Sequence, residues 1–383
     1  MHGMFGSMNK LEALNVSSFD TSHVTDLSGM FYECRALKEL DLTNFDTRNV
    51  TNFTNLFMSC RSITTIKLNP EKFNTEKVTH FDNMFLWCFK LKNVNVSHFK
   101  TENVVATTNM FYGTQIEQLD LSEWRTPNLT TMNSMFRDCT SLKYLDVSNF
   151  DTSKVKNMSN TFEQCVKLPE IKGLENFNTS NVQYMTSMFS AMRAMTEIDI
   201  SHFDTSKVIN MGDSNAISPT TRFGQTGMFQ DCQNLRTIHI GNMDLSSAKN
   251  LSRMFSGCSS LETIDGTFVN GDVVENLNTM FTDCRQLQTI DISGLNVANA
   301  TNTKYMFYGC SLLETIISNN FEAVSITDDQ EMFAQCPNLP NFDTAQTGSS
   351  MAVSQEEGGY LTKPKQKTSV VSDAVQKLAS LLS

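Results

Sequence analysis

The sequence of this 383-residue chain predicts an α/β solenoid of about thirteen rungs, each with one parallel strand and one short helix. This prediction rests on a recurring phenylalanine, on a helical spacing of apolar residues around each phenylalanine, and on a short segment after each one in which polar and apolar residues alternate. The phenylalanine usually follows Met, and successive copies are 25 to 28 residues apart, except for one step of 40. Repeated units of this size stack around one continuous core. These anchor phenylalanines are Phe5, Phe31, Phe57, Phe85, Phe111, Phe136, Phe162, Phe189, Phe229, Phe255, Phe281, Phe307 and Phe333.

Around each anchor, apolar residues recur at intervals of three and four, which predicts a short helix. In the second repeat, Val24, Leu27, Phe31 and Cys34 would share one face of that helix. A Phe-Asp-Thr-Ser stretch precedes it at 19–22, and short oxygen-bearing side chains of this kind are typical helix N-caps.

A short extended segment follows each of these helices. At 142–147 the sequence is Leu-Lys-Tyr-Leu-Asp-Val, and its last four residues alternate between polar and apolar. This alternation is typical of a strand with one buried face. One such strand in each rung, reached through a helix, predicts a parallel sheet along one face of the solenoid.

The order of strand, Phe-Asp-Thr-Ser turn, Met-Phe helix and cysteine resembles the BspA-like leucine-rich-repeat family, whose repeat is also described as DUF285. The stretch 145–155 reads Leu-Asp-Val-Ser-Asn-Phe-Asp-Thr-Ser-Lys-Val and matches that repeat almost letter for letter. The resemblance covers roughly residues 1–344. It implies a leucine-rich-repeat solenoid that mediates adhesion or protein binding, since family members are known mostly as surface proteins.

The chain divides into three parts. Residues 1–344 form the predicted solenoid, and the 40-residue step indicates a polar loop insertion near 209–225. Residues 345–368 are rich in Gly, Ser, Gln and Lys and are predicted to be a linker. Residues 369–383 are predicted to form an amphipathic helix that either caps the last rung or docks into a partner's groove. The apolar face of that helix would contain Val371, Ala374, Val375, Leu378 and Leu382.

Composition limits the partners that we expect. The formal net charge is −11 and the isoelectric point is near 5.1, which argues against nucleic acid and against anionic membranes as partners. No stretch reaches the length of about 18 apolar residues that membrane insertion needs. No signal peptide is visible, so we expect a protein that is intracellular or belongs to a particle assembled in the cytoplasm. Cell-surface location is the expectation if an N-terminal signal is missing from this chain.

The ten cysteines all lie three residues after an anchor phenylalanine. Met or Thr takes this place in the remaining repeats, as a small buried apolar position would allow. We therefore predict a ladder of free thiols rather than disulfides, which fits a reducing compartment.

Motifs for catalysis or ligand binding are absent from the sequence. There is no Cys-x-x-Cys pair, no His-Glu-x-x-His motif, no Gly-rich phosphate loop and no nucleophile elbow. We therefore expect no enzymatic activity, no metal site and no cofactor.

The outward positions of the predicted strands make a polar stripe along the solenoid. It is either a binding face for a basic or hydroxyl-rich partner or a solvated edge, and adjacent aspartates in it would repel one another unless neighbours relieve them. The candidate binding residues are Asp41, Asp120, Tyr144, Asp146, Asp199, His239, Asp265 and Asp291.

Two functions are compatible with these features. The first is a non-enzymatic scaffold for protein–protein interaction, which recognises or attaches to other proteins or a host surface through the long solenoid face. The second is a structural component of a large assembly, such as a viral particle or a cytoskeletal array, anchored by its C-terminal tail.

Overall fold

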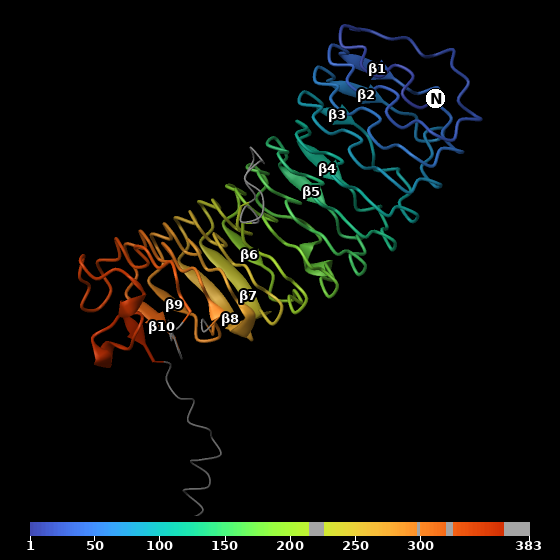
Figure 1. The fold of residues 1–383 in the computed structure, drawn as a ribbon. Helices are drawn as coiled ribbons and strands as arrows, with labels where there is room; N and C mark the ends of the chain where they lie inside the picture. The colour runs from blue at the N-terminus through green and yellow to red at the C-terminus, as the bar shows by residue number, and fades with distance from the viewer. Residues whose placement is uncertain (214–225, 297–298, 319–324, 364–383) are drawn as a thin grey trace, which may run out of the picture.

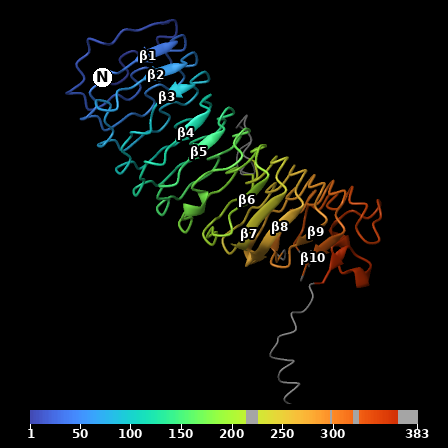
Figure 2. The same ribbon diagram turned by 180° about the vertical axis from the view of Figure 1, so that it is seen from behind.

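The computed structural model of the chain describes residues 1–213, 226–296, 299–318 and 325–363. The chain winds into an elongated solenoid that advances steadily from the N-terminus to the C-terminal end (Figure 1). The view from behind shows the same succession of turns with the labelled strands stacked side by side (Figure 2). The fold is a parallel β-solenoid.

Short strands mark one face of the solenoid, and each pairs in parallel with a strand of a neighbouring turn. They are β1 (Glu39–Asp41), β2 (Thr65–Lys67), β3 (Asn93–Val94), β4 (Gln118–Asp120), β5 (Tyr144–Asp146), β6 (Glu197–Asp199), β7 (Thr237–Asp244), β8 (Thr263–Val269), β9 (Thr289–Asp291), β10 (Thr315–Ile317) and β11 (Leu361–Thr362). Short 3-10 helices lie at η1 (Leu174–Asn176), η3 (Gly271–Val273), η5 (Ser349–Met351) and η6 (Gln355–Glu357).

The strands form four separate sheets, β1-β2-β3, β4-β5, β6-β7-β8 and β9-β10-β11. Strands β1 to β10 give about ten strand-bearing turns. The predicted count of about thirteen rungs, each with a strand and a helix, is therefore not supported. The sheet face is parallel, as predicted, but it is interrupted between β3 and β4, between β5 and β6, and between β8 and β9.

The predicted helix around each anchor phenylalanine is wrong, because within the described ranges no segment of the chain is α-helical. Instead, backbone N–H groups alternate between two kinds of acceptor. The Met30 N–H donates to the Leu27 carbonyl within the turn (3.1 Å), whereas the Phe31 N–H donates to the Leu56 carbonyl of the next turn (3.0 Å). The α/β class is thereby corrected to a β-solenoid built from tight turns.

Left-handed backbone excludes a helix there, at two positions in most turns and at one, Asp231, in the turn around Phe229. In the second repeat these are Gly29 (φ 60°) and Glu33 (φ 55°), two residues on either side of Phe31. A right-handed helix has no place for such residues. Consecutive turns still return an apolar side chain every three or four residues, so the spacing alone does not separate them from a helix.

The Thr of the Phe-Asp-Thr-Ser stretch also has a different role from the predicted helix cap. Its side chain is buried and joins two turns. The Thr21 hydroxyl donates to the Asp46 carbonyl (3.0 Å) and accepts from the Asp46 N–H (2.8 Å). The Asp20 carboxylate caps its own turn by accepting from the Ser22 N–H (3.0 Å).

The core is a continuous column of the anchor phenylalanines. Successive rings from Phe5 to Phe333 stack with centroids 5.2 to 5.8 Å apart, and all except Phe5 are fully buried. The column runs through the 40-residue step, since Phe189 and Phe229 stack at 5.2 Å. The predicted core is therefore confirmed, although the backbone around it is not helical.

All ten cysteines are free and buried, which confirms the predicted thiol ladder. Each thiol donates to the carbonyl of the anchor phenylalanine one turn earlier, as from Cys60 to Phe31 at 3.1 Å. Burial raises the pKa of several of these thiols, to about 12 for Cys139 and Cys232.

We expect these thiols to be unreactive in the folded protein, because a thiol at such a pKa holds almost no thiolate at neutral pH. A thiol-specific disulfide reagent should titrate fewer than about one thiol per chain in buffer and all ten after unfolding in denaturant. Rapid titration of several thiols without denaturant would contradict the buried ladder.

Residues 345–363 are folded and do not form the predicted linker. They contain η5, η6 and β11, and β11 extends the last sheet by pairing with β10. The fully buried Tyr360 packs edge-on against Phe333 at 5.3 Å, and its hydroxyl donates to the Gln346 carbonyl (2.9 Å). This segment covers the C-terminal end of the phenylalanine column. The predicted helix at 369–383, with Val371, Ala374, Val375, Leu378 and Leu382, lies outside the described residues.

Candidate interaction surface

The predicted polar stripe follows the strand-bearing face, where most of its aspartates have a structural task. Asp41 ends β1, and its carboxylate accepts from the Thr43 N–H (3.0 Å) and the Thr43 hydroxyl (2.6 Å). Both hydrogen bonds lower the pKa of Asp41, and the one from the Thr43 hydroxyl has the larger effect. In the same way, the backbone N–H two residues later donates to the carboxylates of Asp120, Asp146, Asp199 and Asp291, at 2.8 to 3.0 Å.

Asp146 is the most deeply engaged of these carboxylates. It is 2% exposed and binds Lys172 at 2.6 Å and the Tyr144 hydroxyl at 3.2 Å. Burial opposes its ionisation, but Lys172 and Ser148 outweigh burial and lower the pKa of Asp146 to about 2. Lys172 thereby relieves the repulsion expected between Asp146 and its register partner Asp120. The ring of Tyr144 stays 38% exposed at the surface.

His239 on β7 joins carboxylates on both sides of its strand. Its Nδ1 lies 2.8 Å from Asp265 on β8, and its Nε2 lies 3.0 Å from Glu197 on β6. Hydrogen bonds to Asp265 and then Glu197 raise the pKa of His239. The predicted repulsion between Asp265 and Asp291 does not arise through strand pairing, since β8 and β9 belong to different sheets.

The strand face is hollowed where the sheet is interrupted between β3 and β4. A depression of about 700 Å³ extends over β2, β3 and the start of β4, and a second of about 410 Å³ continues it to Tyr144. The two depressions share Val94, Asn95 and Gln118 in their linings, and we call the pair the β2–β5 groove. Its charged lining residues are Lys67, Lys92, Glu117 and Asp120, and the others include Leu68, Asn93, Val94, Asn95, Gln118 and Tyr144.

A change in the spacing of the sequence coincides with this interruption. Nine residues separate the anchor phenylalanine from the central apolar residue of the strand in the neighbouring turns, as from Phe85 to Val94. Only eight separate Phe111 from Leu119. One residue is thus missing just before β4, and β4 does not pair with β3.

The loop insertion begins later than the predicted position near 209, because Ile209 and Asn210 still belong to a regular turn. Ile209 donates to the Gln183 carbonyl (2.9 Å), and Asn210 bridges to Asn250. The Met228 N–H then donates to the Met211 carbonyl (2.9 Å), which closes the turn across the insertion. Residues 214–225 lie outside the described residues.

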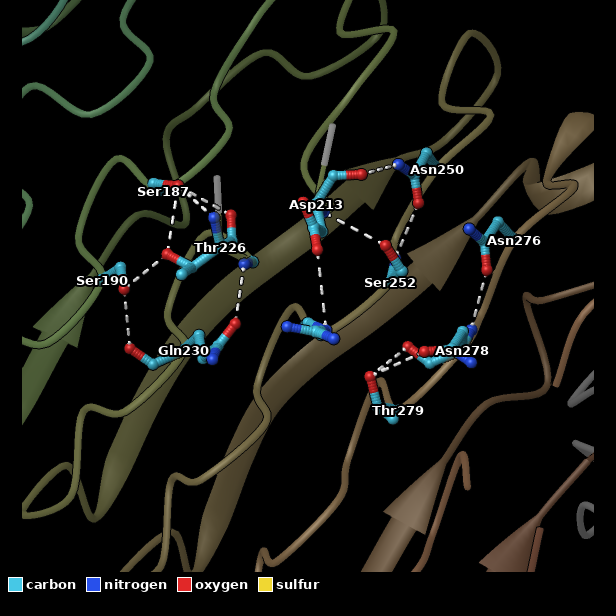
Figure 3. Close-up of polar contacts among 12 residues, drawn as sticks. Ser187, Ser190, Asp213, Thr226, Gln230, Asn250, Ser252, Asn276, Asn278 and Thr279 are labelled. Carbon is cyan, nitrogen blue, oxygen red and sulfur yellow. Dashed lines mark hydrogen bonds and ion pairs between the residues drawn. The ribbon is translucent and has the colours of Figure 1, made fainter. Parts of the chain in front are cut away.

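Polar side chains hold both ends of this insertion (Figure 3). On one side, the Asn250 amide donates to the Asp213 carbonyl (2.6 Å), and the Asp213 N–H donates to the Ser252 hydroxyl (3.1 Å). On the other side, the Ser187 hydroxyl donates to the Thr226 carbonyl (2.8 Å). The base of the insertion is thus fixed to the neighbouring turns.

A buried ion pair lies in turns that precede the insertion, and neither of its members was predicted. Arg137 and Glu163 approach to 3.1 Å with side chains only 13% and 4% exposed. Within the described part of the chain, Glu163 Oε2 and Arg137 Nε have no hydrogen-bond partner. Burial outweighs the attraction of Arg137 and raises the pKa of Glu163 to about 7.

In the ranges that the structure describes, no three His, Cys, Asp or Glu side chains gather in a way that would hold a metal ion. Nor is any helix in those ranges long and apolar enough to cross a bilayer.

Taken together, the parallel strands, the repeated turns and the continuous core define a leucine-rich-repeat-like solenoid. The family described as "Mycoplasma protein of unknown function, DUF285" matches residues 1–116, 62–171, 130–225 and 223–345. The chain belongs to this family, as its resemblance to BspA-like repeats implied.

Solved leucine-rich-repeat proteins from three bacteria are similar to the chain. A leucine-rich-repeat protein from Bacteroides ovatus is 19% identical, with 80% of this chain and 78% of that chain covered and a TM-score of 0.36. A leucine-rich cell surface protein from Faecalibacterium prausnitzii is 17% identical, with coverages of 88% and 79% and a TM-score of 0.36. A leucine-rich-repeat protein from Eubacterium ventriosum is 14% identical, with coverages of 81% and 86% and a TM-score of 0.30. No curated protein matches the chain.

Proposed function

We propose that the chain is a non-enzymatic scaffold for protein–protein interaction, which recognises or attaches to its partner through the strand-bearing face. The observation that carries this proposal is the contrast between the two sides of each strand. The inward central residue is always Leu, Ile or Val, whereas the residue just before it differs in chemistry along the first six strands, β1 to β6, and is Thr in the last four, β7 to β10. At that outward position stand Glu39, Thr65, Asn93, Gln118, Tyr144, Glu197, Thr237, Thr263, Thr289 and Thr315.

Such a surface suits recognition because the core fixes the spacing of the side chains at about 4.8 Å per turn, while their chemistry is free to differ. Tyr144 adds an exposed aromatic ring at the end of the β2–β5 groove, and Tyr is enriched among residues that dominate binding energy. Other proteins, including a host surface protein, are the partners that this face suits. Nucleic acid is disfavoured by the acidic charge.

Two exposed tyrosines offer a matched test. Tyr144 lies on β5 and is 38% exposed. Tyr184 lies outside the named strands, in a row of isolated parallel β-bridges, and is 41% exposed. We would replace each with a photocrosslinking phenylalanine derivative and irradiate the full chain in extract from its native source. We expect a discrete adduct from position 144 and none from position 184. Equal adducts from both positions, or an adduct from position 184 alone, would refute recognition through the strand face.

The alternative role, as a structural part of a large assembly anchored by the C-terminal tail, is not favoured by any described contact. Docking through Val371, Ala374, Val375, Leu378 and Leu382 stays a prediction, since these residues lie outside the described part of the chain.

A further inference from the structure

A separate pocket of about 190 Å³ lies on the strand-bearing face where the sheet is interrupted between β5 and β6. The turn between these strands is one residue longer there, since Phe177 follows Ile171 by six positions and Phe150 follows Leu145 by five. The longer turn has left-handed backbone at Gly173 (φ 95°), where a side chain would collide with the backbone of the preceding turn, and then forms η1. The pocket lies beside this longer turn.

The floor of the pocket is apolar and slightly open. It is formed by Ile171, Leu174, Met195 and Ile198, which come from the longer turn and from the turn that contains β6. Ile171 and Leu174 are each 7% exposed, whereas Leu145 in β5 is 1% exposed. The volume of about 190 Å³ is below the range of about 300–1,000 Å³ that is usual for small-molecule pockets. It suits a single long side chain instead.

The rim of the pocket is acidic. Its remaining lining residues are Glu170, Glu175, Glu197 and Asp199. Among the residues that the structure describes, no basic one lines the pocket. Glu170 is exposed and, in the same part of the chain, has neither an ion pair nor a side-chain hydrogen bond. Glu175 accepts from the Gly173 N–H (3.1 Å) and Asp199 from the Ser201 N–H (2.8 Å). Because a carboxylate offers about four lone pairs, these bonds leave acceptors free.

The basic side chains beside the rim are engaged by other groups. Lys172 binds Asp146 at 2.6 Å, outside the pocket. His239 lies between Glu197 (3.0 Å) and a second carboxylate on β8 (2.8 Å), so a group outside the pocket shares its charge. The Nε2 of His202 lies 3.1 Å from a backbone carbonyl of the floor. The rim therefore keeps an excess of negative charge, which favours a cationic occupant.

We propose that this pocket binds one long basic side chain, lysine or arginine, of a partner protein. The aliphatic stem would lie over Ile171 and Leu174, and the charged end would reach the carboxylates of Glu170 and Glu175. Lysine and arginine both combine such a stem with a charged end. This inference rests on the proposed scaffold function and names the chemistry that the strand-bearing face recognises. Tyr144, whose strand bridges in parallel to the longer turn, would contact the same partner.

The test uses the full chain with ¹³C-labelled methionine methyl groups, because Met195 lines the pocket and its methyl resonance reports binding there. Met195→Leu assigns that resonance. The ligands are capped octapeptides of glycine and serine with one central lysine, norleucine or 2,3-diaminopropionate. Norleucine keeps the stem without the charge, and diaminopropionate keeps the charge on a shorter stem. The lysine peptide should shift the Met195 resonance with a Kd of about 1 mM or lower, at least about fivefold tighter than either of the other peptides.

Glu170→Gln with Glu175→Gln removes two rim charges and keeps the shape of both side chains, and glutamine can still accept from the Gly173 N–H. This double variant should weaken the lysine peptide by at least about fivefold and leave the norleucine peptide unchanged. The matched control is Glu39→Gln with Glu314→Gln, the same charge change at exposed glutamates in β1 and just before β10. It should change binding by less than about twofold. Unmoved resonances of the other methionines would show that both variants keep the fold.

Three results would overturn the inference: no shift of the Met195 resonance with the lysine peptide at about 10 mM, equal binding of the three peptides, or equal losses in the two double variants. Tighter binding of free butylammonium than of the lysine peptide would also overturn it, because the pocket would then take a small amine rather than a side chain of a protein. If the lysine peptide fails while the crosslink from position 144 persists, the inference fails alone and the scaffold function stands.

Discussion

Replacing Phe136 with alanine is expected to lower the free energy of unfolding by about 3–5 kcal/mol. The ring is fully buried and stacks between Phe111 and Phe162, with centroids 5.8 and 5.7 Å away. Its removal takes apolar surface out of the core and leaves a cavity that neighbours on fixed turns fill poorly. In a solenoid each turn contacts only its neighbours, so a loss in the middle weakens both interfaces at once.

Chemical denaturation followed by intrinsic fluorescence would measure this loss. Phe89→Ala is the matched control, because Phe89 is 44% exposed and lies outside the column of anchor rings. It should cost less than about 1 kcal/mol. Equal losses in the two variants would show that the stacked column does not hold the fold together.

Stability should fall as the pH rises from about 4.5 to about 7, and Glu163 should account for a large share of the change. The pKa of Glu163 is about 7 in the folded chain, above the ordinary value of 4.5. The folded state therefore binds the proton more tightly than the unfolded state. The stabilisation of the folded state by protonated Glu163 is full below pH 4.5 and is lost as the pH passes through 7. A shift of this size corresponds to about 3 kcal/mol for a side chain that is almost fully buried.

Glu163→Gln removes this titration and keeps the shape of the side chain. Relative to the natural chain, the variant should gain up to about 3 kcal/mol between pH 4.5 and pH 8, measured by urea unfolding at several pH values. Asp138, whose pKa is also raised by burial, is present in both chains. Glu117→Gln removes an exposed, lysine-paired carboxylate and should leave the pH dependence within about 0.5 kcal/mol. Parallel curves for the natural chain and Glu163→Gln would contradict the burial of an ionisable Glu163.

The repeat itself was readable from the sequence because each turn must place its large side chains at the same point of one core. The anchor phenylalanines and the cysteines follow from that requirement alone, and both predictions are confirmed. The prediction of a helix around each anchor phenylalanine was wrong, because the spacing of apolar residues does not reveal the sign of the backbone angle φ. Gly29 and Asn55, which both take left-handed backbone, were the available signal for turns.

The candidate surface was less accessible to sequence reasoning. The stripe residue Asp146 was found, but its burial beneath Tyr144 and Lys172 depends on contacts between turns. The β2–β5 groove lies where the spacing before β4 is one residue shorter, a difference that leaves no chemical motif in the sequence. Glu163 and Arg137 are ordinary charged residues in the sequence, and only the packing of adjacent turns buries them. The binding role of the stripe residues stays a prediction.

Photocrosslinking from positions 144 and 184 of the full chain tests the central claim, recognition through the strand-bearing face, most directly. Both positions are similarly exposed tyrosines, so a difference in adduct formation reports the face rather than accessibility. We expect a single discrete adduct from position 144 and no adduct from position 184. An adduct from position 184 with none from position 144 would contradict the claim.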